Sequence, residues 1–120
     1  MSDKFIKVAT KEIKEEIALI AKILRTCQND SDVLQNSKSI EKHIHKIKGL
    51  APMMGKPEIG EIATLNDQLL SKIIKDQKIN GIYLTLCESS KIMEQSIKGL
   101  NPDFQEIKQK IATKYSKYLD

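Results

Sequence analysis

The chain has 120 residues, 40% of them apolar, a net charge of +4, and only five glycines and three prolines. This length fits one domain, residues 1–120, which can form a core without disulfides or a metal. So few turn-forming residues exclude an all-β protein. The Ile, Leu, Ala, Met, Glu, Lys and Gln that dominate the chain predict an all-α fold.

The positive charge raises the question of nucleic acid as a partner. However, acidic and basic residues are interspersed, and no two Lys or Arg residues are adjacent. Only 4% of the residues are aromatic, and the basic face lacks base-stacking side chains. We therefore expect a solvated helical surface and no nucleic-acid partner.

Cys27 and Cys87 both fall on apolar helix faces, so we expect buried thiols in a reducing compartment. The N-terminus lacks a signal segment, and no apolar run approaches the roughly 20 residues of a membrane span. These features predict a cytoplasmic protein without a membrane partner.

Apolar residues at spacings of three and four predict the helices. The first runs from about Lys4 to Cys27, and the short polar side chains of residues 29–32 end it. The second begins at Asp32 or Ser37, either of which can cap it. Its buried stripe consists of Ile40, Ile44, Ile47, Ala51 and Met54.

Gly55 is the expected end of the second helix, and Pro57 fits the first turn of the third, which runs to about Lys75. The expected inner side of the third helix consists of Ile59, Ile62, Leu65 or Asn66, Leu69 and Ile73.

Residues 78–81 form a predicted loop before the fourth helix, which starts at Ile82. Asn101 is expected to cap the fifth helix, with Pro102 in its first position. Short loops imply antiparallel neighbours, and the pattern predicts an antiparallel four-helix bundle with a fifth helix. The last two stripes are Ile82, Leu86, Ser89, Met93, Ile97 and Leu100, then Phe104, Ile107, Ile111, Tyr115 and Tyr118 or Leu119.

His45 is the candidate functional residue. Lys48 and Gly49 follow three and four positions later, so all three share one helix face. Lys48 brings positive charge beside the imidazole, and Gly49 leaves open space through which an anion or another protein can reach it. A glycine within a helix costs about 1 kcal/mol relative to alanine. Access to His45 would compensate for this cost, and close helix packing is the alternative explanation.

Asp67 is the expected partner of this ring. If the turn between the second and third helices centres on Lys56, His45 and Asp67 lie eleven residues on either side of it. In an antiparallel hairpin both then sit roughly 16 Å from the turn. A hydrogen bond from one ring nitrogen to Asp67 would fix the tautomer and raise the basicity of the other nitrogen. Thr64 and Gln68 are alternative partners, and a plain boundary histidine is the non-functional interpretation.

Other chemistries lack a motif. His43 and His45 are two residues apart and point to different sides of a helix, whereas a two-histidine metal site needs a spacing of four. No Cys or third His is near them, so we expect no metal. No glycine-rich phosphate loop and no nucleophile motif with Ser or Cys is present.

The segment from His45 to Gly55 resembles the histidine-containing phosphotransfer (HPt) family. It is most similar to the phosphoacceptor domain of CheA-type chemotaxis histidine kinases, whose pattern is His-x-x-Lys-Gly and then a further Gly. The apolar-striped first helix and the five-helix count extend the resemblance over nearly the whole chain. The resemblance implies an HPt-like fold, with His45 as phosphoacceptor, Lys48 supporting the phosphoryl charge and Asp67 orienting the ring.

The sequence departs from this pattern at three positions. Asp67 stands where the chemotaxis kinases usually have Glu, and Thr64 stands where they often have a second His. Pro52 occupies a position where the family has small residues. Because Pro52 lacks an N–H, we expect the helix to bend just past the site.

The resemblance also implies a role in two-component signalling, as a phosphorelay carrier without its own kinase or nucleotide site. The implied partners are a histidine kinase and a response-regulator receiver domain, with Mg²⁺ on the receiver and no cofactor on this chain. We expect a monomer. One alternative is a non-phosphorylated helical adaptor that docks receivers or other signalling proteins. The other is a basic nucleic-acid-binding bundle, whose binding would depend steeply on salt.

Overall fold

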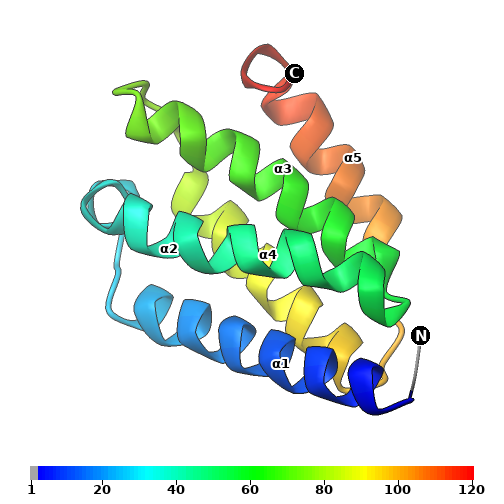
Figure 1. Cartoon of the computed structure of the whole chain (residues 1–120). Coiled ribbons are helices and arrows are strands. Elements are labelled where there is room, and N and C mark those ends of the chain that lie inside the picture. The colour runs from blue at the N-terminus through cyan, green and yellow to red at the C-terminus, as the bar shows by residue number, and fades with distance from the viewer. Residues whose placement is uncertain (1–2) are drawn as a thin grey trace.

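The computed structural model describes residues 3–120, which form five α-helices, two short 3₁₀ turns and no β-strand (Figure 1). The predicted all-α class and the count of five helices are therefore confirmed. The elements are α1 (Asp3–Arg25), α2 (Asp30–Leu50), η1 (Ala51–Met54), α3 (Pro57–Ile74), α4 (Ile82–Ile97), α5 (Phe104–Lys114) and η2 (Ser116–Tyr118).

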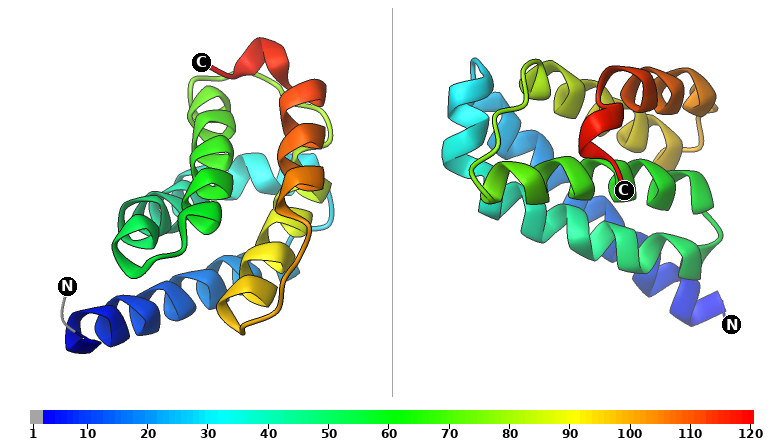
Figure 2. Two further views of the ribbon diagram at one scale, coloured as in Figure 1. Left: turned by 90° about the vertical axis from the view of Figure 1, so that its right-hand side faces the viewer. Right: turned by 90° about the horizontal axis from the view of Figure 1, so that it is seen from above.

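Four of the helices pack as a closed ring. Helix α1 contacts α2 and α4, while α3 contacts the same two helices from the other side. Consecutive helices run in opposite directions (Figure 1), and α5 lies against α3 and α4, on the far side of the molecule from α1 (Figure 2). The radius of gyration is 13.7 Å, close to the value of about 13.6 Å expected for a compact domain of this length.

Isoleucine dominates the core inside this ring. The predicted stripes of α2 and α3 point inward, as do the apolar residues that recur at spacings of three and four along α1. Each fully buried side chain of this size contributes about 1.5–3 kcal/mol to folding. In the stripe predicted for the fourth helix, Leu100 is wrong, because it lies beyond the end of α4 and is 59% exposed. Within residues 3–120, each helix is too short or too polar to cross a membrane. The largest fully buried residues are Ile13, Ile17, Ile20, Ile40, Ile44, Ile47, Ile59, Ile62, Leu69, Leu70, Ile82 and Leu86.

Helix α2 begins earlier than predicted. Its first residue is Asp30, so both Asp32 and Ser37 are wrong as starting points. Asn29 caps the helix, because its side-chain oxygen accepts a hydrogen bond from the backbone N–H of Asp32 at 3.0 Å. The short polar residues 29–32, which were expected to end the first helix, therefore also contain the cap of the second.

Helix α5 begins later than predicted. Asp103, not Asn101, is the capping residue, since its side chain accepts a hydrogen bond from the backbone N–H of Glu106 at 3.0 Å. Pro102 consequently lies before the helix, which starts at Phe104. The sequence offers an Asn and an Asp two residues apart, and the hydrogen bond decides between them.

The connection between α2 and α3 follows the expected bend. Helix α2 ends at Leu50, two residues before Pro52, and the chain tightens into the 3₁₀ turn η1. The missing N–H of Pro52 explains why the α-helical hydrogen bonds stop here. Gly55 was expected to end the second helix, but it ends η1 instead, with a left-handed φ of 75°. Pro57 starts α3 as predicted.

The two cysteines differ in burial. Cys27 is buried as predicted, whereas Cys87 is only half-buried, because it lines a shallow hollow between α1 and α4. Burial is the largest influence on both thiols and raises the pKa of each. Both are therefore poor nucleophiles at neutral pH.

Candidate functional site

His45 lies on the outer surface of α2, and its side chain is 67% exposed. Its neighbours Ile44 and Ile47 are buried in the core. Successive residues on a helix are rotated by about 100°, so a histidine directly after a buried isoleucine sits at the edge of the buried stripe. Local helical geometry alone therefore presents this ring to solvent.

Asp67 reaches this ring from α3. Its Oδ2 atom lies 3.7 Å from Nδ1 of His45, and the residue is 92% buried, with 8% exposed. The two residues were expected at the same height across the α2–α3 hairpin, and the structure brings them together. A separation of 3.7 Å is too long for the expected hydrogen bond.

Lys48 explains this separation. Its Nζ atom donates a hydrogen bond to Oδ2 of Asp67 at 3.2 Å, so this oxygen is oriented toward the ammonium group. A charged donor makes the stronger bond to a carboxylate. Lys48 itself is 41% exposed, which leaves its side chain room to move.

Glu41 is a second acidic neighbour of the ring, which the sequence did not lead us to expect. Its Oε2 atom lies 3.9 Å from Nδ1 of His45, one helical turn away on the same helix. The spacing of four residues was the available signal. One side-chain oxygen or nitrogen from each of Glu41, His45 and Asp67 lies within 4.8 Å of the others.

The two carboxylates influence each other strongly. A hydrogen bond with Asp67, burial and the negative charge of Asp67 raise the pKa of Glu41. For Asp67, burial raises the pKa, but hydrogen bonds from Glu41 and Lys48 and the charges of Lys48 and His45 outweigh it, so the net shift is downward. Glu41 is therefore the carboxylate that takes up a proton first.

Gly49 opens the surface beside the ring. A Cβ atom there would meet no atom of residues 3–120 within 4 Å, apart from the adjacent backbone of its own helix. Close helix packing therefore does not explain this glycine. The close approach occurs at Gly60 instead, where an added Cβ would lie 3.4 Å from Cβ of Ala51 and 3.5 Å from Cδ of Pro52.

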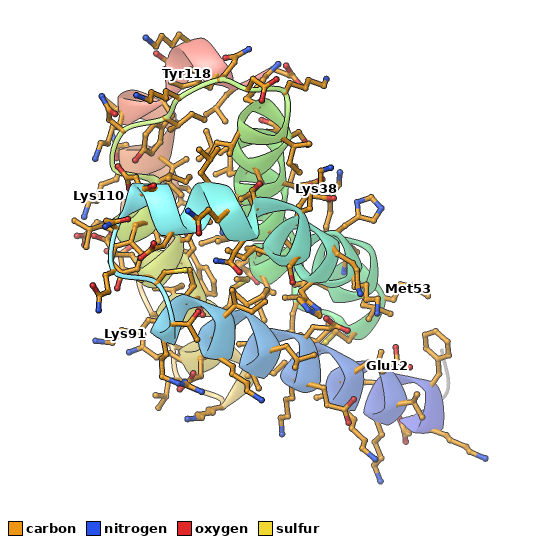
Figure 3. All side chains as sticks on the ribbon, turned by 90° about the vertical axis from the view of Figure 1, so that its left-hand side faces the viewer. Glu12, Lys38, Met53, Lys91, Lys110 and Tyr118 are labelled. Atoms are coloured by element: carbon orange, nitrogen blue, oxygen red, sulfur yellow. The ribbon has the colours of Figure 1, made fainter. Side chains whose placement is uncertain are left out.

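A surface hollow adjoins this open space. The hollow lies between α1 and α2, and Figure 3 shows Glu12 on α1 at the same end of the molecule as Met53, which is 37% exposed. Approach to the ring from this side therefore passes over acidic side chains. The hollow is lined by Glu12, Glu15, Glu16, His45, Lys46, Gly49 and Leu50.

Thr64 and Gln68 do not join this cluster. The hydroxyl of Thr64 donates to the backbone oxygen of Gly60 at 2.8 Å, within its own helix. In the described part of the chain, neither residue hydrogen-bonds to His45. Asp67 and Glu41 are thus the ring's polar neighbours.

His43 faces a different partner. Its Nδ1 atom lies 2.5 Å from Oε2 of Glu16 on α1, and its side chain is only 13% exposed. Lys46 contacts the other oxygen of Glu16 at 3.4 Å. This group joins α1 to α2 and leaves His45 as the accessible histidine of the pair.

This arrangement permits three kinds of chemistry at His45: nucleophilic attack, proton transfer and metal coordination. Comparisons of the chain with the profiles of known protein families, with curated proteins and with solved structures find no significant match.

Proposed function

We propose that the chain is a histidine phosphotransfer protein with an HPt-like four-helix bundle, acting in two-component signalling. His45 accepts a phosphoryl group from a histidine kinase or a phosphorylated receiver and passes it to a receiver-domain aspartate. The observation that carries the proposal is the 67% exposed ring whose Nδ1 faces the buried carboxylate of Asp67. The ring of helices α1 to α4 supports the bundle assignment.

The tautomer of His45 determines which nitrogen reacts. A proton on Nδ1 faces Asp67 and Glu41, at 3.7 and 3.9 Å. Nε2, at the other edge of the ring, then carries the free electron pair. This pair forms the N–P bond while the bond from phosphorus to the donor oxygen breaks, and that oxygen leaves with its electrons. The ring becomes positively charged, and the two carboxylates stabilise this charge.

Lys48 supplies positive charge for the incoming phosphoryl group. Its ammonium lies within 3.2 Å of Asp67 and is partly exposed, so it can turn toward phosphoryl oxygens while staying close to the ring. The partner protein provides the nucleotide or the receiver aspartate with its Mg²⁺. Catalysis then depends mainly on positioning and charge stabilisation.

The proposal is tested by labelling. Purified chain is incubated with phosphoramidate, a small donor with an N–P bond, and separately with ATP and a panel of histidine kinases. The expected product is acid-labile, base-stable phosphate on His45, which a panel of receiver domains removes. The matched variants are His45→Gln, which should lose the label, and His43→Gln, which should retain it.

Two outcomes contradict the proposal. Undiminished labelling of His45→Gln would place the phosphate elsewhere. A wild-type chain that binds receivers but never takes up phosphate, and whose binding survives His45→Gln, would be an adaptor.

A further inference from the structure

We propose that Glu41, His45 and Asp67 form a binding site for a divalent transition-metal ion of the zinc type. We also propose that an ion bound there prevents phosphorylation of His45. The second statement rests on the proposed phosphotransfer function, whereas the first does not. The metal competes with Lys48 for Asp67 and with a proton for Nδ1 of His45.

The distances suit a small ion. Nδ1 of His45 lies 3.7 Å from Oδ2 of Asp67 and 3.9 Å from Oε2 of Glu41, and all three ligand atoms lie within 4.8 Å of one another. Zinc binds such atoms at about 2.0–2.2 Å in a tetrahedron, which separates neighbouring ligands by about 3.4 Å. The two His45 distances exceed this value by less than about 0.5 Å and the separation of the two carboxylates by at most about 1.4 Å, so side-chain rotations must draw the two acids together around the ion.

The buried carboxylate also has unused bonding capacity. Asp67 is 8% exposed, and when Glu41 is ionised and cannot donate a proton, the Oδ1 atom of Asp67 is buried without a hydrogen-bond partner among residues 3–120. Buried polar atoms in folded proteins are nearly always paired, so an unpaired oxygen indicates a missing partner. A cation between Asp67 and Glu41 would bind this carboxylate through one or both oxygens and relieve the repulsion between the two acids.

The ligand set selects the type of metal. One imidazole nitrogen with two carboxylates suits zinc and similar transition ions, whereas Mg²⁺ and Ca²⁺ prefer oxygen ligands alone. Three protein ligands leave a fourth position for water. The exposure of the His45 side chain leaves that position open.

Lys48 is the internal competitor of the metal. Its Nζ atom lies 3.2 Å from Oδ2 of Asp67, and two cations cannot share that oxygen without strong repulsion. Because Lys48 is 41% exposed, it can move into solvent when the ion binds. Lys48→Met should therefore tighten metal binding, although the same change should slow phosphorylation.

Because the neutral ring carries a single proton, His45 cannot bind a metal and attack a phosphoryl group at the same time. Phosphorylation at Nε2 needs the proton on Nδ1. Metal coordination through Nδ1 needs the proton on Nε2, which removes the electron pair that attacks phosphorus. A bound ion therefore holds His45 in the unreactive tautomer.

Isothermal titration of the full chain with zinc chloride tests the site. We expect one zinc ion per chain. Both Glu41→Gln and His45→Gln should weaken zinc binding by more than about tenfold, because even the loss of a residue that only hydrogen-bonds to a metal ligand has at least this effect. The control Glu12→Gln removes the same charge nearby and should bind zinc as the wild type does. Unchanged affinity in both Glu41→Gln and His45→Gln, or no binding by the wild type, would overturn the site.

Labelling by phosphoramidate with and without zinc tests the antagonism. Zinc should suppress labelling of the wild type, and EDTA should restore it. For Glu41→Gln, labelling with zinc is compared with labelling of the same variant without zinc. The two should be equal at the zinc concentration that suppresses labelling of the wild type. Equal suppression in both proteins, or labelling unchanged by bound zinc, would overturn the antagonism. A chain that binds zinc through these ligands but never labels retains the metal site and loses the proposed function.

Discussion

Lys48 and Asp67 form an ion pair between α2 and α3, with Nζ 3.2 Å from Oδ2. The same oxygen is 3.7 Å from Nδ1 of His45, so one carboxylate oxygen faces both a lysine and the imidazole. The lysine holds the hydrogen bond in the free protein. A phosphoryl group that draws the lysine away would leave Asp67 free to bond to the ring as the ring becomes charged.

Lys48→Met should slow phosphorylation of His45 by about tenfold or more, because it removes the ammonium group that shares the Asp67 carboxylate with the ring. Its effect on the free energy of unfolding should be at most about 1 kcal/mol, since the lysine is partly exposed. Initial labelling rates and urea unfolding measure the two effects. Lys48→Arg should restore part of the rate, and a rate equal to that of the wild type in Lys48→Met would exclude an electrostatic role.

Gly49→Ala should stabilise the protein by about 0.5–1 kcal/mol, because alanine is the better helix former and its Cβ meets open space. The same substitution should slow transfer to a receiver, since the methyl group narrows access to His45. Gly60→Ala is the matched control. Its Cβ would make an ordinary contact with Ala51 at 3.4 Å and does not meet His45, so this substitution should leave transfer to the receiver unchanged. Undiminished transfer in Gly49→Ala would show that access does not explain this glycine.

Stability should depend on Glu41 and on pH. The pKa of Glu41 is raised on folding, so its favourable contribution is fully present below the unfolded-state pKa of about 4.3 and is lost as pH rises through the folded-state value. Glu41→Gln does not titrate and should therefore be more stable than the wild type at pH 7, by less than about 1 kcal/mol for this partly exposed group.

Urea unfolding in EDTA between pH 4.5 and 7 measures this difference, which should shrink toward the acid end. The pKa of Asp67 is lowered on folding, so its contribution has the opposite sign. It is present above the unfolded-state pKa of about 3.9 and is lost as pH falls through the folded-state value, below the range used here. A difference between Glu41→Gln and wild type that does not change with pH would contradict the prediction.

Asp30→Ala should destabilise the fold by about 2–3 kcal/mol, because two backbone donors lose a charged acceptor. The carboxylate of Asp30 accepts hydrogen bonds from the N–H groups of Gly81 and Tyr83, each at 2.8 Å, and so joins the start of α2 to the start of α4. Asp30→Asn offers one oxygen and should lose about half as much. Thermal unfolding of both variants measures these losses, and a midpoint temperature of Asp30→Ala equal to that of the wild type would refute the prediction.

Much of the candidate site could be predicted from spacing. Two helices joined by a short turn bring residues equally distant from the turn to the same height, which is why Asp67 was expected opposite His45. Glu41 stands four residues before His45, so helical spacing alone places its carboxylate beside the ring. The wrong starts of α2 and α5 arose because several Asn, Asp and Ser residues lie within a few positions of each start, and any of them can cap a helix until one accepts a hydrogen bond from the backbone.

The sequence by itself determined the helices, their buried faces and the outward position of His45, because apolar periodicity reports burial directly. Only the tertiary structure decided which polar side chain takes which partner. Lys48 rather than His45 bonds to Asp67, and Asn66 rather than Leu65 is buried, where it accepts a hydrogen bond from Ser89 of α4 at 3.2 Å. The choice between Lys48 and His45 depends on a difference of less than 1 Å between two distances across the helix interface, which a helical repeat does not encode.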